Sequence, residues 1–375
     1  MSYNVLKGKL VISLEQAVAA PFCSAKLADS GARVIKVERK EGDFARYYDD
    51  FVKGQSTYFV WLNRGKESLI ANIKDKKDIK LIQSITAKAD IFIQNLAPNS
   101  LKKIGLDSGT LRKKNSKLIT CDISGYGESG PYENMKAYDL LIQAETSLCS
   151  LTGSVDSPGR VGVSVCDIAC GLNAYSLLLE AMIKKEKTGR GSSIKVSLFD
   201  SLSEWMNVPY LQYLYTKSSP QRVGLSHPSI VPYGCFKTKD KKEILLSIQN
   251  EREWASFSKN ILNLSEEKEK KFKSPTLRLK NKNEVNKIIS EKFIEEKSKY
   301  LIKVLKKNSI AFGILNNLKD FSNHPQLKTA HSKTDKGKFK FIPPPNLQKK
   351  IFFKKVPGLG EHSKKIRKEF SKNEK

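Results

Sequence analysis

The chain has 375 residues, of which 39% are hydrophobic, so it is long enough for two domains with a sizeable core. Its formal net charge of +28 favours anionic partners in general, but the excess lysines form runs such as 266–271 and 364–368 without aromatic interleaving or a known nucleic-acid-binding motif, so a solvated surface is favoured over nucleic-acid binding. No stretch has the ~20 uninterrupted apolar residues that cross a bilayer and the first ten residues lack a signal-peptide apolar region, so we expect a cytoplasmic protein with no membrane partner.

Apolar runs alternate with helical patterns through the first half of the chain. The predicted strands cover 10–14, 33–38, 68–73, 89–95 and 118–124, and predicted helices cover 21–30 and 78–89. Strands separated by helices of this length predict βαβ units and a parallel sheet.

The pattern changes in the second half. A helix at 200–215 is expected to leave the sheet, and strand-like runs at 233–238 and 243–248 flank a polar turn, which predicts a hairpin. Helices rich in lysine and glutamate follow to about residue 307, and a short strand is expected at 311–315. We therefore predict an α/β fold with a large domain over 1–214, a smaller α+β domain over 215–325, and a segment 326–375 that returns to the large domain.

Six cysteines are spread widely along the chain. Only Cys166 and Cys170 are close in sequence, one helical turn apart, and no histidine or second cysteine pair accompanies them. Buried free thiols in a reducing cytoplasm are therefore favoured over a metal site or a disulfide framework. We expect no metal.

Asp167 is a lone carboxylate in a segment of small and apolar residues, where a strand-like run gives way to a helical pattern. A charged group in such surroundings is costly unless something offsets it. Two interpretations remain open from this segment. Asp167 is either the N-cap of the helix that follows or a nucleophilic carboxylate in a site where water is scarce.

Basic side chains follow several of the predicted strands, where ligands bind in open α/β sheets. Each of them alone is more often a surface charge, but together they suit a polyanionic, nucleotide-like ligand; they are Arg39, Arg64, Lys66, Lys103 and Lys136. The chain lacks a P-loop, a dinucleotide fingerprint, a Gly-x-Ser-x-Gly elbow and a His-Glu-x-x-His motif. The four histidines lie in polar sequence, so a carboxylate is favoured as the catalyst.

Several segments, in this order along the chain, resemble the class III CoA-transferases of the CaiB–BaiF type, a family with formyl-CoA transferase and α-methylacyl-CoA racemase as relatives. The matching segments are Val18–Cys23, Leu27–Arg39, Asn63–Leu69, Gly125–Gly127, Lys136–Asp139, Cys166–Ala169 and Pro357–His362. No single segment is specific, but the set is, and it covers essentially the whole chain.

The resemblance implies a Rossmann-like large domain, an interlocked homodimer, and coenzyme A as substrate and product with no tightly bound cofactor. It also implies that Asp167 attacks the acyl-CoA thioester to give a mixed anhydride, which CoA converts to an enzyme thioester before the acceptor acid reverses the steps. Covalent catalysis of this kind divides one exchange into easier steps, and a dry site protects the anhydride from water.

The resemblance further assigns residues to the two substrates. Tyr138, Arg160 and Gln249 are expected to flank the acyl group. The expected contacts with CoA are Ala17, Val18, Arg39, Leu62, Asn63, Arg64, Lys66, Asn95, Lys103, Ile104 and Lys136.

Two departures from the family pattern bear on the substrate. Tyr138 stands where the racemase branch has a histidine, which favours a transferase over the alternative of an acyl-CoA racemase or epimerase. The glycine-rich loop of the formyl-CoA branch is replaced by 227–234 and 247–254, which is more similar to branches that handle C4–C5 dicarboxylates such as succinate. Arg160 or Arg252 can pair with a distal carboxylate through two hydrogen bonds, and a structural ion pair is an equally good interpretation of either.

Overall fold

The computed structural model describes residues 4–371, and the chain divides into two compact units. Among the described residues, the first comprises 4–149, 160–211 and 328–371, and the second comprises 150–159 and 212–327. The sequence-based boundaries lay at 214 and 325. The second unit also takes in the short excursion 150–159, which no change in composition or periodicity marks.

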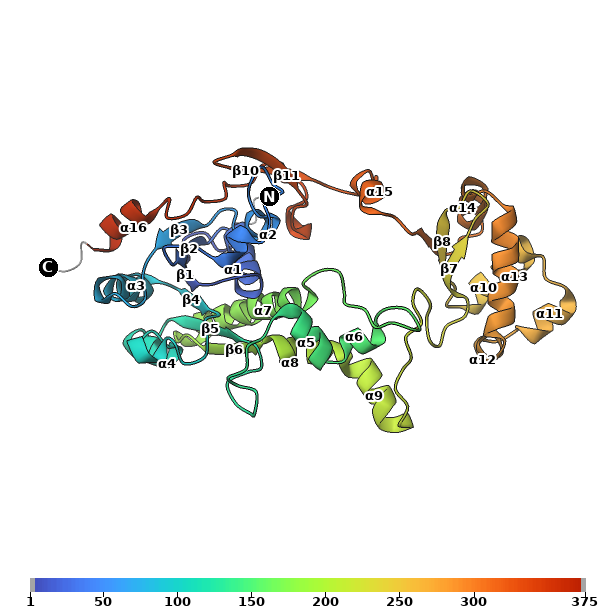
Figure 1. Cartoon of the computed structure of the whole chain (residues 1–375), viewed down its shortest axis with the longest axis horizontal. Helices are drawn as coiled ribbons and strands as arrows, with labels where there is room; N and C mark the ends of the chain where they lie inside the picture. Colours follow the sequence, from blue (N-terminus) through green and yellow to red (C-terminus); the bar gives the residue numbers. More distant parts are fainter. Residues whose placement is uncertain (1–3, 372–375) are drawn as a thin grey trace. The chain divides into compact units, whose positions relative to one another are not determined.

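A six-stranded sheet forms the centre of the first unit (Figure 1). All neighbouring strands are parallel, in the order β3-β2-β1-β4-β5-β6, so their carboxyl ends share one edge. This confirms the predicted parallel sheet. The strands are β1 (Leu10–Leu14), β2 (Arg33–Glu38), β3 (Glu67–Ile70), β4 (Ile91–Gln94), β5 (Ile119–Ser124) and β6 (Ser193–Ser197).

Helices cover both faces of this sheet, because successive strand residues point to opposite faces. Val11 of β1 belongs to an apolar cluster with α1, α7 and α8, and its neighbour Ile12 belongs to a second cluster with α3, α4 and α16. The helices of the unit are α1 (Ala19–Asp29), α2 (Thr57–Leu62), α3 (Lys76–Lys88), α4 (Ser108–Lys114), α5 (Asp139–Glu145), α7 (Val165–Thr188), α8 (Leu198–Ser203) and α16 (Ser363–Phe370). The short helix α6 (Leu148–Leu151) has residues in both units.

α7 has 24 residues and is long and apolar enough to cross a membrane by length and composition alone. It packs against α1, β5 and β6, and its buried residues Cys170, Ala174 and Leu178 belong to the core cluster beside the sheet. It ends at Gly189, whose left-handed φ of 68° is the common conformation after a helix. α7 is therefore a core helix of the first unit.

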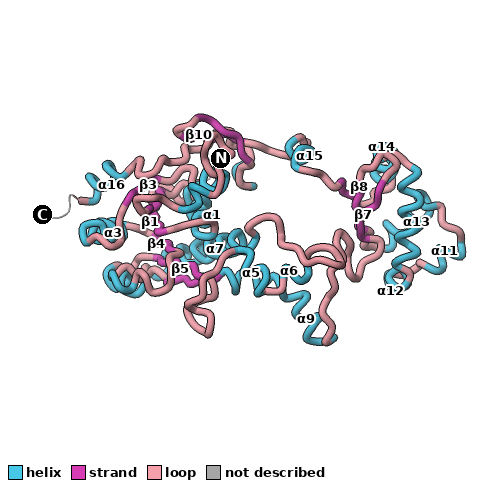
Figure 2. Tube along the Cα trace, viewed as in Figure 1, coloured by secondary structure: helices cyan, strands magenta, loops and turns pink. Residues whose placement is uncertain are grey.

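The second unit is built on a three-stranded antiparallel sheet, β7-β8-β9, shown in part as magenta segments in Figure 2. Strands β7 (Tyr233–Lys237) and β8 (Glu243–Ser247) form the predicted hairpin, and β9 (Phe312–Ile314) pairs with β8. The sheet and helices share an apolar cluster that includes Phe236 and Trp254. The helices are α10 (Glu251–Phe257), α11 (Glu266–Lys271), α12 (Pro275–Lys280), α13 (Lys282–Glu295), α14 (Ser298–Lys307) and α15 (Leu318–Ser322).

Several features differ from the sequence-based elements, and helices α2, α4, α5, α6 and α16 were not expected. Strand β6 and the hairpin of β10 (Ala330–Thr334) with β11 (Gly337–Phe341) were not expected. Both are short and carry exposed lysines or serines on one side, so their apolar signal is weak. The single helix expected at 200–215 is divided into α8 and α9 (Asn207–Thr216), with a short 3₁₀ turn between them.

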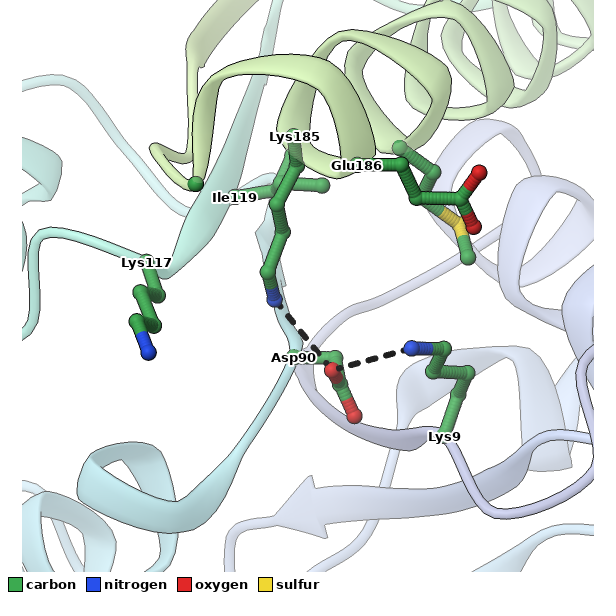
Figure 3. A pocket seen from close by; sticks show the side chains of 8 residues that line it. Lys9, Asp90, Lys117, Ile119, Lys185 and Glu186 are labelled. Carbon is green, nitrogen blue, oxygen red and sulfur yellow. Dashed lines mark hydrogen bonds and ion pairs between the residues drawn. The ribbon is translucent and has the colours of Figure 1, made fainter.

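A cavity of about 240 Å³ lies at the amino edge of the six-stranded sheet, near the end of α7 (Figure 3). Lys9 and Lys185 both point to Asp90, with Nζ atoms 3.7 and 3.3 Å from its Oδ1, and Asp90 Oδ2 accepts a hydrogen bond from the Leu10 N–H. The interactions of the Asp90 carboxylate thus link the starts of β1 and β4 to α7. Asp167 lies about 27 Å from Lys185 along α7, because the helix rises 1.5 Å for each of the 18 residues between them.

The close packing of α1 on α7 gives a direct test at Gly171. A Cβ atom there would lie 2.7 Å from the Ala19 carbonyl oxygen and 3.1 Å from Phe22 Cβ. We expect Gly171→Ala to lower the free energy of unfolding by about 1–3 kcal/mol because the clash outweighs the better helix propensity of alanine. Urea unfolding measures this, and Gly313→Ala, where a Cβ meets open space, is the control. A stability equal to that of the parent would contradict the packing.

Candidate active site

Asp167 lies in the first turn of α7 and is only partly exposed. The N-cap of this helix is Ser164, whose side chain makes no capping hydrogen bond. The interpretation of Asp167 as the N-cap is therefore wrong. Its carboxylate is left available for another role.

The carboxylate of Asp167 faces the beginning of a second helix. The backbone N–H of Ala19, the first residue of α1, donates a hydrogen bond to it. Helix α1 starts directly after the loop that leaves β1, so its positive end lies at the carboxyl edge of the sheet. Gly171, one turn further along α7, permits this close approach of the two helices.

A second carboxylate, that of Asp139, stands near Asp167. Burial raises the pKa of Asp167, and repulsion from Asp139 raises it further, to about 7, against the stabilising hydrogen bond from Ala19. Asp139 is the first residue of α5. Its Oδ1 accepts the Cys166 N–H at 2.8 Å and its Oδ2 accepts the side-chain amide of Gln143 at 2.7 Å, so its position beside the start of α7 is fixed.

The loop between β1 and α1 is fixed from two sides. Ala17 has a φ of 62°, in the left-handed region that residues other than glycine rarely adopt. Its N–H donates to Asp43 Oδ1 at 3.1 Å. The preceding Gln16 exchanges two backbone hydrogen bonds with the side-chain amide of Asn95, at 2.8 and 2.9 Å. The strained loop is thus held beside the residue that contacts Asp167.

Asp43 belongs to a network of fully buried charges. Lys36 Nζ lies 2.8 Å from Asp43 Oδ2 and 3.4 Å from Glu15 Oε1, and Lys66 Nζ lies 2.6 Å from the same Glu15 oxygen. Burial would raise the pKa of Glu15, but the two lysines outweigh it and hold the pKa at about 2. Burial, together with Lys36, lowers the pKa of Lys66 to about 8. These four side chains stabilise one another in the absence of solvent.

Two tyrosines border the carboxylates. Tyr138 is the N-cap residue of α5 and is 59% exposed. Tyr48 lies close enough to Asp43, Asp167 and Tyr138 that these groups, after burial, raise its pKa to about 12. Tyr48 also packs edge-on against Tyr58, at 5.4 Å between ring centroids. Two phenol side chains therefore lie near the carboxylates of Asp139 and Asp167.

This arrangement is suited to nucleophilic catalysis by a carboxylate. A pKa near 7 makes Asp167 more basic, and so a better nucleophile, than a solvated aspartate, while it is still ionised in part at neutral pH. The N-terminus of α1 provides backbone donors and a favourable dipole where negative charge develops on an attacked carbonyl.

A family model for CoA-transferase family III matches residues 6–363. The chain belongs to this family. The transferase is 36% identical to human (Homo sapiens) succinyl-CoA:glutarate CoA-transferase, over 86% of this chain and 74% of that protein. It is 32% identical to the succinate–glutarate CoA-transferase of Agrobacterium fabrum, over 88% of this chain and 84% of that protein.

A solved structure has the same fold. The crystal structure of a CaiB/BaiF family protein from Brucella suis matches with a TM-score of 0.84 and 30% identity, over 97% of this chain and 99% of that chain. The family match and the related transferases identify the protein as a class III acyl-CoA:carboxylate CoA-transferase. The resemblance noted in the sequence is confirmed.

The residues expected to contact CoA differ in their exposure to solvent. Asn63, Arg64 and Lys66 are buried and their side chains bond to protein groups; the guanidinium of Arg64 contacts Asp29 and the Trp61 carbonyl. Leu62 and Val18 are buried in apolar surroundings. The exposed cations of the set are Arg39, Lys103 and Lys136, and Ala17, Asn95 and Ile104 are half-buried.

The expected acyl-site residues lie in both units. Tyr138 and Arg160 belong to the first, and Arg160 is exposed. Gln249 belongs to the second, where its amide donates to Ser247 Oγ at 2.9 Å. Arg252 is exposed on α10, also in the second unit.

Sequence reasoning missed several groups around Asp167: Tyr48, the roles of Asp43 and Gln143, and the N–H of Ala19. The contact between Gln143 and Asp139 could have been predicted, because residues four apart lie on one face of a helix. The others come from loops whose conformation no periodicity predicts.

The raised pKa of Asp167 predicts a pH-dependent stability. The Asp167 carboxyl group ionises near pH 4 in the unfolded chain and near pH 7 in the folded chain. Its ionisation therefore lowers the free energy of unfolding, by an amount that grows between these two pH values to at most about 4 kcal/mol. We expect Asp167→Asn to be stabilised relative to the parent by more at pH 8 than at pH 5, as measured by thermal unfolding. Glu180→Gln, an exposed change on the same helix, is the control. Equal differences at both pH values would be evidence against the raised pKa.

The buried network predicts a large effect of a small change. Asp43→Asn keeps an oxygen for the Ala17 N–H but leaves Lys36 without its nearest carboxylate. Breaking a buried ion pair from one side costs about 3–5 kcal/mol, and we expect a loss of unfolding free energy of that size in urea titrations. Asp50→Asn, an exposed change seven residues away, is expected to stay within about 0.5 kcal/mol of the parent. A similar result for both variants would exclude the network as a source of stability.

Proposed function

We propose that this enzyme transfers CoA from a C4–C5 dicarboxylyl-CoA, with succinyl-CoA as donor, to a second dicarboxylic acid of similar length, through covalent intermediates on Asp167. The half-buried carboxylate of Asp167, with its raised pKa and the Ala19 N–H beside it, is the observation that carries the mechanism. The relatives named for succinyl-CoA with glutarate or with mesaconate support the substrate class.

The proposed steps balance without any further reagent. An oxygen of Asp167 attacks the thioester carbonyl of the donor, the C–S bond breaks, and CoA leaves as the thiolate. The thiolate then attacks the Asp167 carbonyl of the mixed anhydride, which releases the donor acid and leaves CoA bound to Asp167 as a thioester. The acceptor carboxylate attacks this thioester, and the displaced thiolate takes the acceptor acyl group, which restores Asp167 as a carboxylate.

Positive charge for the two substrates comes from different side chains. The exposed cations Arg39, Lys103 and Lys136 suit the phosphates of CoA, while the buried Asn63, Arg64 and Lys66 support the fold around them. The guanidinium of Arg160 is exposed and makes no ion pair with any residue in 4–371, so it is available for the distal carboxylate of a dicarboxylic acid. Tyr138, in the same unit as Asp167 and Arg160, is proposed to border the acyl group.

Exposed apolar side chains support a homodimer. On α9, Val208, Tyr210 and Tyr215 are 67%, 58% and 84% exposed, which is unusual for a helix that faces water in a monomer. We assign this surface to a second copy of the chain. The six free cysteines support a cytoplasmic location, where thiols stay reduced.

The nucleophile is tested by replacing one carboxylate. We expect Asp167→Asn to lower kcat for CoA transfer from succinyl-CoA to glutarate by at least about a thousandfold, because the remaining groups position substrates but cannot form the anhydride, while CoA still binds in calorimetry. Mass spectrometry after hydroxylamine quenching of the parent enzyme should find hydroxamate on Asp167 during turnover. Glu180→Gln should keep the activity of the parent. Full activity of Asp167→Asn would refute the assignment.

The same samples distinguish the racemase alternative. A racemase or epimerase exchanges the α-proton of its acyl-CoA with solvent and needs no acceptor acid. Tyr138, and not a histidine, precedes Asp139 in this chain, so we expect no deuterium from D₂O at the α-carbon of an acyl-CoA in the absence of acceptor.

A further inference from the structure

The side chain of Gln143 joins three segments of the first unit. It is fully buried, and both ends of its amide are used. Its Nε2 donates to Asp139 Oδ2 at 2.7 Å, and its Oε1 accepts the N–H of Val161 at 2.9 Å. Asp139 in turn accepts the N–H of Cys166, the residue before Asp167. One amide therefore connects the start of α7 with the segment that carries Arg160.

Arg160 combines a fixed backbone with a free head group. The N–H that follows it, on Val161, is bonded to Gln143, whereas the guanidinium has no hydrogen-bond or ion-pair partner within residues 4–371. An exposed arginine whose neighbouring backbone is held by a hydrogen bond loses less conformational entropy on binding a carboxylate than an arginine on a mobile loop. Its planar fork matches a carboxylate through two parallel hydrogen bonds.

We propose that Gln143 is a positioning residue for substrate selection: it holds Arg160 at a fixed place relative to Asp167, so that an acid with a second carboxylate is preferred over a monocarboxylic acid. This inference rests on the proposed function. Gln143 does not touch the substrate, and it acts through the Val161 N–H and through Asp139. The preference for dicarboxylic acids is then a property of the bonded chain Arg160–Val161–Gln143 and not of Arg160 alone, whereas the bond of Gln143 to Asp139 serves turnover of every acceptor.

The chain offers a matched control for a purely structural role. The amide of Gln94 also lies between a carboxylate and a backbone N–H: its Nε2 donates to Asp122 Oδ1 at 2.9 Å and its Oε1 accepts the Leu96 N–H at 2.8 Å. Replacing Gln94 or Gln143 by leucine removes the same two kinds of hydrogen bond. Only the change at Gln143 releases the segment that carries Arg160.

The test compares two acceptors with succinyl-CoA as donor: glutarate, and valerate as a monocarboxylic acid of the same chain length. The quantity measured is the ratio of their kcat/KM values. Arg160→Ala is expected to lower this ratio at least about tenfold, through loss of a charge-assisted pair. Gln143→Leu is expected to lower it by a similar factor, and the double variant by little more than either, because both remove the same interaction. Gln94→Leu is expected to leave the ratio within about twofold of the parent.

Gln143→Glu separates the two bonds of the amide. It keeps an acceptor for the Val161 N–H but loses the donor to Asp139, so turnover is expected to fall for both acceptors while their ratio stays within about twofold of the parent. This variant also keeps the size of the side chain if leucine unfolds the protein.

Several outcomes would overturn the proposal. One is an unchanged ratio of kcat/KM values in Arg160→Ala, whose exposed side chain makes a folding defect unexpected. The others are additive effects in the double variant, and a fall of the ratio in Gln94→Leu as large as that in Gln143→Leu. Failure of the proposed function has a different signature: the parent enzyme would transfer CoA from succinyl-CoA to neither acid, whereas an enzyme that loses activity in Asp167→Asn but shows no effect at Arg160 and Gln143 retains the proposed function without this selection.

Discussion

The candidate active site depends on four charged side chains that are buried away from water. Glu15, Lys36, Asp43 and Lys66 have no exposed side-chain surface, and each lies within 3.4 Å of an opposite charge. Burial of charge is costly, and it is tolerated only where partners and hydrogen bonds are complete. This network supports the loop before α1, because Asp43 accepts the N–H of Ala17, a residue in the left-handed region of φ.

Two carboxylates on either side of this loop have opposite ionisation behaviour. Glu15, at its beginning, is surrounded by lysines and has a pKa of about 2, whereas Asp167, facing its end, meets another carboxylate and has a pKa of about 7. Both are desolvated, so the difference comes from the sign of the neighbouring charges. Environments that move the pKa values of nearby groups apart in this way assign them different roles. Glu15 is a charge that stabilises the fold, and Asp167 is the proposed nucleophile.

The sequence predicted the architecture better than the site. Strands such as β1 and β2 are short and mostly apolar at their centres and lie between helices with 3.6-residue periodicity, and these patterns are sufficient for a parallel sheet. Asp167 drew attention because a lone carboxylate in apolar sequence is costly, and the family resemblance then made it the candidate nucleophile. The basic residues near Arg64 and Lys66 were read as ligands for CoA, and the structure places their side chains in buried pairs. Sequence cannot distinguish these cases, because a lysine that binds a phosphate and one that binds a buried glutamate differ only in partners distant along the chain.

The order of segments in the first unit has a consequence for biosynthesis. α16 covers β3 and α3 with Ile366 and Phe370, and Glu369 pairs with Arg33 at the start of β2. Residues 212–327, by contrast, form a continuous stretch of the second unit with its own apolar cluster. During translation residues 212–327 can therefore fold before α16, the last helix that covers the six-stranded sheet, has been made. Until α16 is made, the apolar surface of β3 and α3 that Ile366 and Phe370 cover stays exposed.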